Sequence, residues 1–325
     1  MTSFLPPRRR IWPVVLRVAA VALVAAGVYF FARNIDGRVL KAALRGASPV
    51  LIALAAAMGF ANLFFKALCW RVMLAPRHPV PLLRLYRYTI AAFAGSLLLP
   101  ARAGEALRVW LLKRRDGVPV TSSTGVAISE KLVDGCAMIL SVSPTLFLIH
   151  GLPVWVGRTI AVLFGGAAVG LTVALVARRR ARPDGLIGKL TLGMTAFATP
   201  GTFALALCAC LGAWMSDFTC VLLVLAAVGV KVPPAVGLLI LLGVNVAILI
   251  PSTPGNVGSL EIGAVAALDL VGVPQAPAMA FAILYHAVQA IPLLAAGLLD
   301  IRLLLWARRG EEVDAAREVT VAEGP

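Results

Sequence analysis

The sequence predicts an all-α polytopic membrane protein, with about six full spans and two re-entrant or broken-helix hairpins arranged as inverted-topology repeats. Three observations lead to this prediction: an apolar composition, a series of long apolar runs, and two similar segments that each follow a break rich in proline and glycine. Hydrophobic residues make up 60% of the 325 residues and charged residues only 14%. So few charged groups cannot cover a soluble domain of this length.

Six apolar runs are long enough to be membrane spans, since crossing about 30 Å of hydrocarbon takes roughly 18 residues or more. The first run follows a basic start and could be mistaken for a secretory signal. It is about 20 residues long and no clear small-residue cleavage site follows it, so we expect a retained first span. The runs lie at residues 12–31, 49–68, 121–149, 154–177, 202–228 and 277–299.

Two further apolar runs end in breaks instead of continuing as spans. Residues 88–99 lead into PARAGE, and residues 234–250 lead into PSTPGNVGSLE, so proline and glycine interrupt each helix and a glutamate follows the break. A second segment then begins, at 105–112 in the first case and at 259–271 in the second. Each pair could dip into the bilayer and return to the side from which it came.

A similar segment follows each hairpin. GVPVTSSTGVAISEK begins at Gly117 and GVPQAPAMAFAILYH begins at Gly272, so one alignment superposes the two Gly-Val-Pro motifs and places Lys131 opposite His286. We assign the two copies to about residues 86–150 and 234–300. Internal duplication with broken helices is typical of transporters.

Lysine and arginine collect in five clusters, which mark the cytoplasmic side of a membrane protein. All five fall on one side if both hairpins return to their starting side. The first hairpin then enters from the cytoplasm and the second from outside, so the copies are inverted. We expect a cytoplasmic N-terminus at 1–11, a transmembrane domain at 12–306 and a short cytoplasmic tail at 307–325. The clusters lie within residues 8–10, 71–87, 113–115, 178–182 and 302–309.

Other classes of function find little support. The net charge of +15 could indicate nucleic acid, but the basic residues form short clusters that suit topology signals and anionic lipid heads. All five cysteines lie in or at the ends of apolar spans, and the three histidines belong to no HExxH pattern. We therefore expect no nucleic-acid partner, no metal and no other cofactor.

Several charged residues lie where lipid would be expected. Glu130, Lys131 and Asp134 fall near the middle of the run at 121–149, where charges are costly and usually functional. Glu130 and Asp134 share a helix face, and Lys131 can reach Asp134 at i,i+3. The alternative is an ion-pair cluster that only pins helices together. Asp217, in the middle of another run, is a candidate proton carrier.

The first hairpin brings Arg102, Glu105 and Arg108 to about membrane depth, and Gly104 supplies the backbone freedom that a tight reversal needs. Arginine suits phosphate because its planar fork donates two parallel hydrogen bonds. We expect Arg102 and Arg108 to hold a polar head, and the carboxylates of Glu105, Glu130 and Asp134 to set the charge of the cavity.

The second hairpin offers a different set of groups. Gly255, Asn256 and Gly258 open its returning half, whose free N–H groups favour an anion. Glu261 in the first turn is either part of a polar site with Asn256 or a simple helix cap. His286 is either a titratable group at the site or a packed histidine.

These motifs together resemble the lysylphosphatidylglycerol synthase transmembrane family, also called the flippase-like domain family, over about residues 12–306. The resemblance implies an integral inner-membrane lipid translocase, which in the best-known members moves an aminoacylated phospholipid beside a soluble synthase domain. Family members usually have arginine at Lys131 and often near His286. The family elements fall on Arg102, Gly104 and Glu105, on Glu130, Lys131 and Asp134, and on Pro254, Gly255, Gly258 and Glu261.

We therefore expect a multi-pass lipid flippase or lipid-export protein of a bacterial inner membrane, and not an enzyme. Its cargo would be a phospholipid, aminoacyl-phospholipid, glycolipid, polyprenyl-linked or hopanoid lipid, and a separately encoded lipid-synthesis enzyme is a candidate partner. Two alternatives stay open: an intramembrane lipid-modifying enzyme with Glu130 or Glu261 as general base, and a scaffold of a lipid-synthesis complex. The absence of a recognisable metal or nucleophile set argues against the enzyme.

Overall fold

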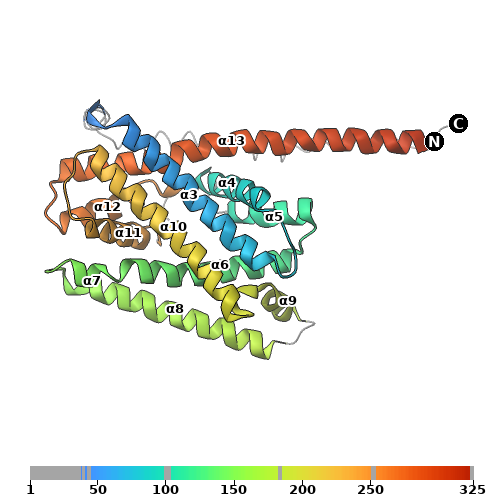
Figure 1. The fold of residues 1–325 in the computed structure, drawn as a ribbon, viewed down its shortest axis with the longest axis horizontal. Coiled ribbons are helices and arrows are strands. Elements are labelled where there is room, and N and C mark those ends of the chain that lie inside the picture. The colour runs from blue at the N-terminus through green and yellow to red at the C-terminus, as the bar shows by residue number, and fades with distance from the viewer. Residues whose placement is uncertain are drawn as a thin grey trace, which may run out of the picture.

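The protein is helical throughout the part that its computed structural model describes, which comprises residues 38, 41, 45–98, 104–181, 185–249 and 254–322, the last stretch from 301 as backbone only (Figure 1). The prediction of an all-α polytopic membrane protein is confirmed. The predicted first span at 12–31 lies outside the described residues, and so does Arg102.

Five of the described helical segments are long and apolar enough to cross a membrane, and they match the other five predicted spans. They contain α3 (Pro49–Leu74), α6 (Val120–Val142) with α7 (Thr145–Leu148), α8 (Val154–Arg180), α10 (Pro200–Ala227) and α13 (Gln275–Ala322). A short helix, α9 (Leu186–Gly193), and a 3-10 turn, η2 (Thr195–Phe197), join α8 to α10.

The predicted span at 121–149 is confirmed, but it is not one continuous helix. The helix α6 ends at Val142, and a separate turn, α7, begins after Pro144. Proline has no N–H for the helical ladder and its ring crowds the preceding turn, so the helix stops there. The charged residues in the middle of α6 are unaffected, since the break comes two turns later.

Two pairs of short helices interrupt the series of long ones. The first pair is α4 (Leu82–Leu98) with α5 (Gly104–Asp116), and the second is α11 (Ala235–Ala247) with α12 (Ser259–Asp269), preceded by the turn η3 (Pro254–Asn256). At 1.5 Å per residue even α4 is only about 25 Å long, which is less than the roughly 30 Å of a hydrocarbon core.

The two pairs enter the bundle from opposite ends (Figure 1). The end of α3 and the start of α6 lie at the right-hand end of the body, so α4 and α5 leave that end and return to it. The end of α10 and the start of α13 lie at the left-hand end, and α11 and α12 return there. A long helix, two short ones and another long helix thus occur twice, in opposite directions.

The Gly-Val-Pro motifs form the same turn in both places. Gly117 and Gly272 have left-handed φ angles of 65° and 77°, which glycine adopts without strain. The next N–H then bonds back into the preceding helix, from Val118 to the Leu112 carbonyl at 3.2 Å and from Val273 to the Leu268 carbonyl at 3.1 Å. Each motif therefore ends a short helix and leads into a long one.

Glycines also let the two helices of each pair approach closely. A Cβ added to Gly104 would collide with the Ala92 carbonyl oxygen and with Ser96, so α5 begins in contact with α4. A Cβ added to Gly263 on α12 would lie 2.5 Å from the Gly243 carbonyl oxygen on α11. Both pairs are therefore closed by backbone contact that a larger residue would prevent.

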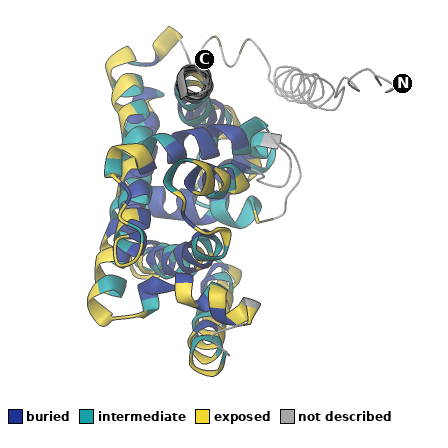
Figure 2. Cartoon of the chain, turned by 90° about the vertical axis from the view of Figure 1, so that its right-hand side faces the viewer, coloured by how far each residue is buried: buried dark blue, intermediate teal, exposed yellow. Residues whose placement is uncertain are grey.

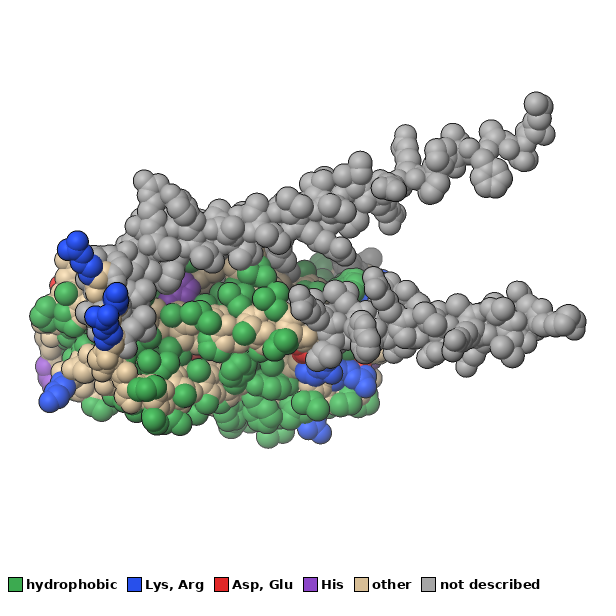
Figure 3. All heavy atoms as spheres, turned by 90° about the horizontal axis from the view of Figure 1, so that it is seen from above, with side chains coloured by type: hydrophobic (Ala, Val, Ile, Leu, Met, Phe, Trp, Pro, Cys, Tyr) green, Lys and Arg blue, Asp and Glu red, His purple; other side chains and the backbone are tan. Residues whose placement is uncertain are grey.

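The long helices α3 and α10 run side by side through the centre of the body. The helix α13 packs against both α4 and α12. Burial is highest in this central layer and lowest on the outside, as Figure 2 shows. The outer helix α8 buries few side chains and exposes many apolar ones, such as Val162 and Phe164. In Figure 3 hydrophobic side chains cover the middle of the face, and lysine and arginine lie towards its ends. Such a surface suits lipid.

Candidate functional site

A buried ion pair joins the first hairpin to the long helix that follows it. Nη2 of Arg108, on α5, donates to Oε2 of Glu130, on α6, at 3.2 Å. The indole N–H of Trp70, on α3, donates to the same oxygen at 2.7 Å, and the guanidinium carbon lies 4.0 Å from the centre of the Trp70 ring. Arg108 and Glu130 are only 1% and 2% exposed. The two charges compensate each other away from water, with the aromatic face adding to the binding of the cation.

The position of Arg108 follows from the helix α5 itself. Gly104, Arg108 and Leu111 are spaced i, i+4 and i+7, so they share one face, and all three are buried. Because Gly104 holds that face against α4, the guanidinium points into the protein. Its Nε and Nη1 atoms find no hydrogen-bond partner among the described residues, so two donors remain for water or a ligand oxygen.

The partners of Asp134 and Lys131 differ from the prediction. Lys131 does not reach Asp134: its Nζ lies 2.6 Å from Oε1 of Glu105 on α5. Asp134 instead pairs with Lys66 of α3 at 3.1 Å and accepts a hydrogen bond from the Trp214 indole of α10, also at 3.1 Å. Successive helical residues point about 100° apart, so Lys131 turns towards α5 while Glu130 and Asp134 turn towards α3.

The second hairpin carries a buried pair of its own, between a carboxylate and an imidazole. Oε1 of Glu261, on α12, lies 2.6 Å from Nδ1 of His286 on α13, and its Oε2 accepts the Gly258 N–H at 2.7 Å. Of the two alternatives for Glu261, the helix cap is confirmed, because one oxygen accepts the Gly258 N–H, while its second oxygen faces the histidine. Glu261 and His286 are 8% and 5% exposed.

The two copies place equivalent pairs in unlike surroundings. Each pair joins the glutamate that follows a hairpin break to the basic residue of the next long helix, and Lys131 and His286 are aligned in the repeat. In the first copy the side chains of Lys131 and Glu105 are 48% and 32% exposed. In the second copy the corresponding values for His286 and Glu261 are 6% and 11%.

The break in the second hairpin depends on left-handed backbone. Gly255, Asn256 and Gly258 have φ angles of 68°, 59° and 87°. Glycine accepts such angles freely and asparagine more readily than most residues, so this sequence can turn sharply at that point. Gly258 caps α12, and Pro254 begins η3, where only its backbone is described.

The ends of the two hairpins lie side by side. The turn η3 packs against α4, and a Cβ added to Gly255 would lie 3.4 Å from the carbonyl oxygen of Leu97. The last described residues of α4 thus touch the break of the opposite hairpin.

An open pocket of about 590 Å³ lies beside Glu261. Its wall is mostly apolar, and all of its lining residues come from 257–283, in the second copy. Gly258 and Glu261 line it near the hairpin break, and Asp269 and Gln275 line it where α12 ends and α13 begins. No cluster of three or more metal-ligating side chains occurs in the part of the chain that the structure describes.

Lys66, Trp70 and Trp214 were not predicted as site residues. Lys66 gave a signal, since it is a charge within an apolar run, but nothing in the sequence distinguishes these two tryptophans from ones that anchor a span. Each becomes part of the site only because α3 and α10 pack beside α6.

No curated protein matches the chain. A match over residues 17–297, which covers most of the chain and both hairpins, is to the Lysylphosphatidylglycerol synthase TM region. The protein therefore belongs to the family of the lysylphosphatidylglycerol synthase TM region, which is associated with flippase-like function on membrane lipids.

Proposed function

We propose that the protein is a lipid flippase or lipid-export protein that moves a polar lipid head past the two hairpin ends while the acyl chains stay in the bilayer. One observation carries this proposal: two hairpins enter from opposite ends and meet at Leu97 and Gly255, and each copy pairs a buried carboxylate with a basic side chain. Membership of the family supports a lipid as cargo. Broken helices around polar groups are the usual way to build such a path.

The groups of the first copy suit an anionic head. Lys131 and Glu105 are partly exposed and can exchange their mutual contact for a passing head group. Deeper in the protein, the two unused donors of Arg108 fit a phosphate or another oxygen-rich group. Glu130 balances the charge of Arg108 when no cargo is bound, so the site does not hold an uncompensated cation.

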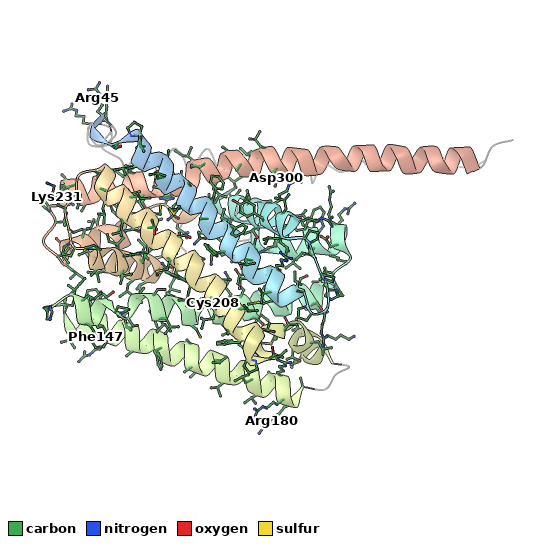
Figure 4. All side chains as sticks on the ribbon, viewed as in Figure 1. Arg45, Phe147, Arg180, Cys208, Lys231 and Asp300 are labelled. Carbon is green, nitrogen blue, oxygen red and sulfur yellow. The ribbon has the colours of Figure 1, made fainter. Side chains whose placement is uncertain are left out.

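The orientation of this path is part of the proposal. The last turns of α5 and α8 each hold three basic residues and that of α3 holds Arg71, and these ends lie where Arg180 is labelled in Figure 4. That end would be cytoplasmic under the positive-inside rule. Lys231 lies at the opposite end in the same view.

Single-cysteine labelling tests this orientation, after the five native cysteines have been replaced. A membrane-impermeant maleimide added to intact cells should label Lys231→Cys, and Arg180→Cys should react only after the membrane is opened. The reverse pattern would contradict the proposed orientation.

Transport can be tested with purified protein in vesicles of phosphatidylethanolamine and phosphatidylglycerol. A phosphatidylglycerol carrying a fluorescent NBD head-group label is bleached by dithionite only in the outer leaflet, so an active protein increases the bleached fraction. Arg108→Ala should abolish most of this increase and Arg108→Lys should retain part of it. Arg180→Ala, an exposed arginine on α8, is the matched control.

Folding and transport must be separated in this test, because Arg108→Ala leaves Glu130 buried without its cation. The double variant Arg108→Met with Glu130→Gln removes both charges and should fold. We expect it to remain inactive. Wild-type rates in this double variant would exclude the pair from the path. A chemically modified lipid, detected by mass spectrometry of the same vesicles, would favour the enzyme alternative.

A further inference from the structure

The equivalent pairs of the two copies differ in chemistry as well as in exposure. Glu105 faces lysine at the surface, whereas Glu261 faces histidine inside the protein. Imidazole is the side chain that changes charge most readily near neutral pH, and a lysine ammonium does not. Only the buried pair of the second copy therefore combines two groups that can both change protonation.

The geometry of this pair is compatible with two protonation states. At 2.6 Å a hydrogen must lie between Nδ1 of His286 and Oε1 of Glu261. Nδ1 can supply it in the neutral ring and in the imidazolium, so the hydrogen bond persists in both. The neutral ring gives the pair a charge of −1, and one added proton brings the charge to zero. The Gly258 N–H holds the carboxylate in place throughout.

One member of the pair borders a pocket. Glu261 lines the open pocket of about 590 Å³, which Asp269 and Gln275 also line. Those two residues lie at the end of α12 and the start of α13, which is the left-hand end of the body in Figure 1. The pocket therefore extends from the hairpin break towards the end opposite to the basic clusters, which is the side from which we expect a proton to arrive.

Few other charges face the pair. The helices α11 and α12 contribute no lysine or arginine, and η3 has no titratable side chain. On α4, Arg84 and Tyr88 bind Asp116, Arg87 binds Asp300, and Tyr86 bonds to a carbonyl oxygen. The helix α3 carries Lys66, Cys69 and Arg71, and α10 carries Asp217 and three cysteines, at positions 208, 210 and 220. On α13, Tyr285 precedes the histidine.

From these observations we propose that Glu261 and His286 form a proton-binding site, and that one proton taken up from the pocket side accompanies each passage of an anionic head. The coupling rests on the proposed lipid function, whereas proton binding does not. Loss of the pair's negative charge removes the repulsion that an anionic phosphate would meet at the second hairpin. Return of the negative charge then repels the phosphate from this position. The proton leaves from the ring when the site faces the opposite side.

Proton binding can be measured without any lipid substrate, since the chain has three histidines. Replacing His78 and His150 by glutamine leaves His286 as the one ring that ¹⁵N-histidine labelling reports. In lipid nanodiscs its ring nitrogens should change between the neutral and charged patterns as the bulk pH is lowered. Glu261→Gln should displace that transition. A ring that stays in one state would overturn the proposal.

Coupling is then measured with NBD-phosphatidylglycerol in the vesicles described above, with a pH difference imposed in either direction. The wild type should translocate several-fold faster under one direction than under the other. His286→Gln and Glu261→Gln should lose this difference, whereas the double variant at His78 and His150, which keeps the pair, should retain it. Asp217→Asn, which alters a carboxylate on α10, should also retain it.

The outcomes separate the two proposals. Translocation that ignores the pH difference in the wild type would refute the coupling and leave the flippase function standing. Loss of the pH response in Asp217→Asn but not in His286→Gln would move the proton site to α10 and overturn the assignment. If no lipid moves at all, the flippase function fails for this lipid, and the titration of His286 still decides whether the pair binds a proton.

Discussion

The two hairpins are both closed by contact at a glycine, at Gly104 in the first and at Gly263 in the second. In the second hairpin the break itself is described as well, and Gly255, Asn256 and Gly258 have positive φ angles there. The glycines of these hairpins therefore serve two physical purposes, since some allow close approach of helices and others allow the backbone to turn.

The two copies also differ in which member of the buried pair lies on the hairpin. The first copy keeps its buried hairpin charge on Arg108 and places the carboxylate on the following helix, at Glu130. The second copy places the carboxylate on the hairpin, at Glu261, and a histidine on the following helix. In the function proposed above, the first copy uses its cation to hold an anionic head, and the second uses a group that takes up a proton. Four substitutions test this contrast, given in order of expected effect.

Breaking the buried pair of the first copy should have the largest effect. Arg108→Ala leaves the Glu130 carboxylate buried without its cation, which typically lowers the free energy of unfolding by about 3–5 kcal/mol. The thermal unfolding of purified protein, followed by size-exclusion fluorescence, should shift strongly downwards. The double variant Arg108→Met with Glu130→Gln should recover most of the loss, and an unchanged melting curve for Arg108→Ala would contradict a buried pair.

Substitution of Gly104 should come next, and it distinguishes the two kinds of glycine. Gly104→Ala forces α5 away from α4, a strain of about 1–3 kcal/mol, and Gly104→Asn should be worse because its side chain is larger. The same melting assay should show both losses together with loss of transport. Equal stability of Gly104→Asn and the wild type would exclude close contact as the reason for this glycine.

Substitution of Gly258 should cost less and depend little on the size of the new side chain. No atom lies within 4 Å of an added Cβ there, so only the backbone angles matter. Gly258→Ala should lose about 1–3 kcal/mol in the melting assay, and Gly258→Asn should lose about as much, because a φ of 87° with a ψ of −47° lies outside the left-handed α region that asparagine tolerates. A larger loss for asparagine than for alanine would indicate a steric constraint.

Separating the exposed pair should have the smallest effect on stability. Lys131→Ala breaks a contact with Glu105 that is partly in solvent, and such pairs contribute about 0–1 kcal/mol. The melting curve should therefore change little, whereas transport of NBD-phosphatidylglycerol should slow if Lys131 meets the head group. Lys131→Arg should keep both properties, and a loss of stability as large as that of Arg108→Ala would contradict the contrast.

Much of this architecture could be read from the chain itself. Apolar runs predicted the long helices, because a helix of about 20 apolar residues crosses the hydrocarbon core with its backbone groups hydrogen-bonded to one another. Proline and glycine set the breaks, and the repeated Gly-Val-Pro motif indicated that the turns at Gly117 and Gly272 are equivalent. The charges at Arg108, Glu130 and Glu261 were evident because hydropathy could not account for them. Pro144 was as visible as the other prolines, yet the break that it causes in the helix was not predicted. The boundaries of the two copies and the roles of the site residues stay predictions.

The pairing of those charges was decided only by tertiary structure. Spacing along α6 suggested Lys131 as the partner of Asp134, but the rotation of that helix turns Lys131 towards α5 and gives Asp134 to Lys66. Trp70 and Trp214 joined the site for the same reason, since α3 and α10 pack beside α6. Sequence determines which segments are helical because periodicity and breaks are local properties. It does not determine which charge meets which, because that depends on how each helix is rotated against neighbours far away in the chain.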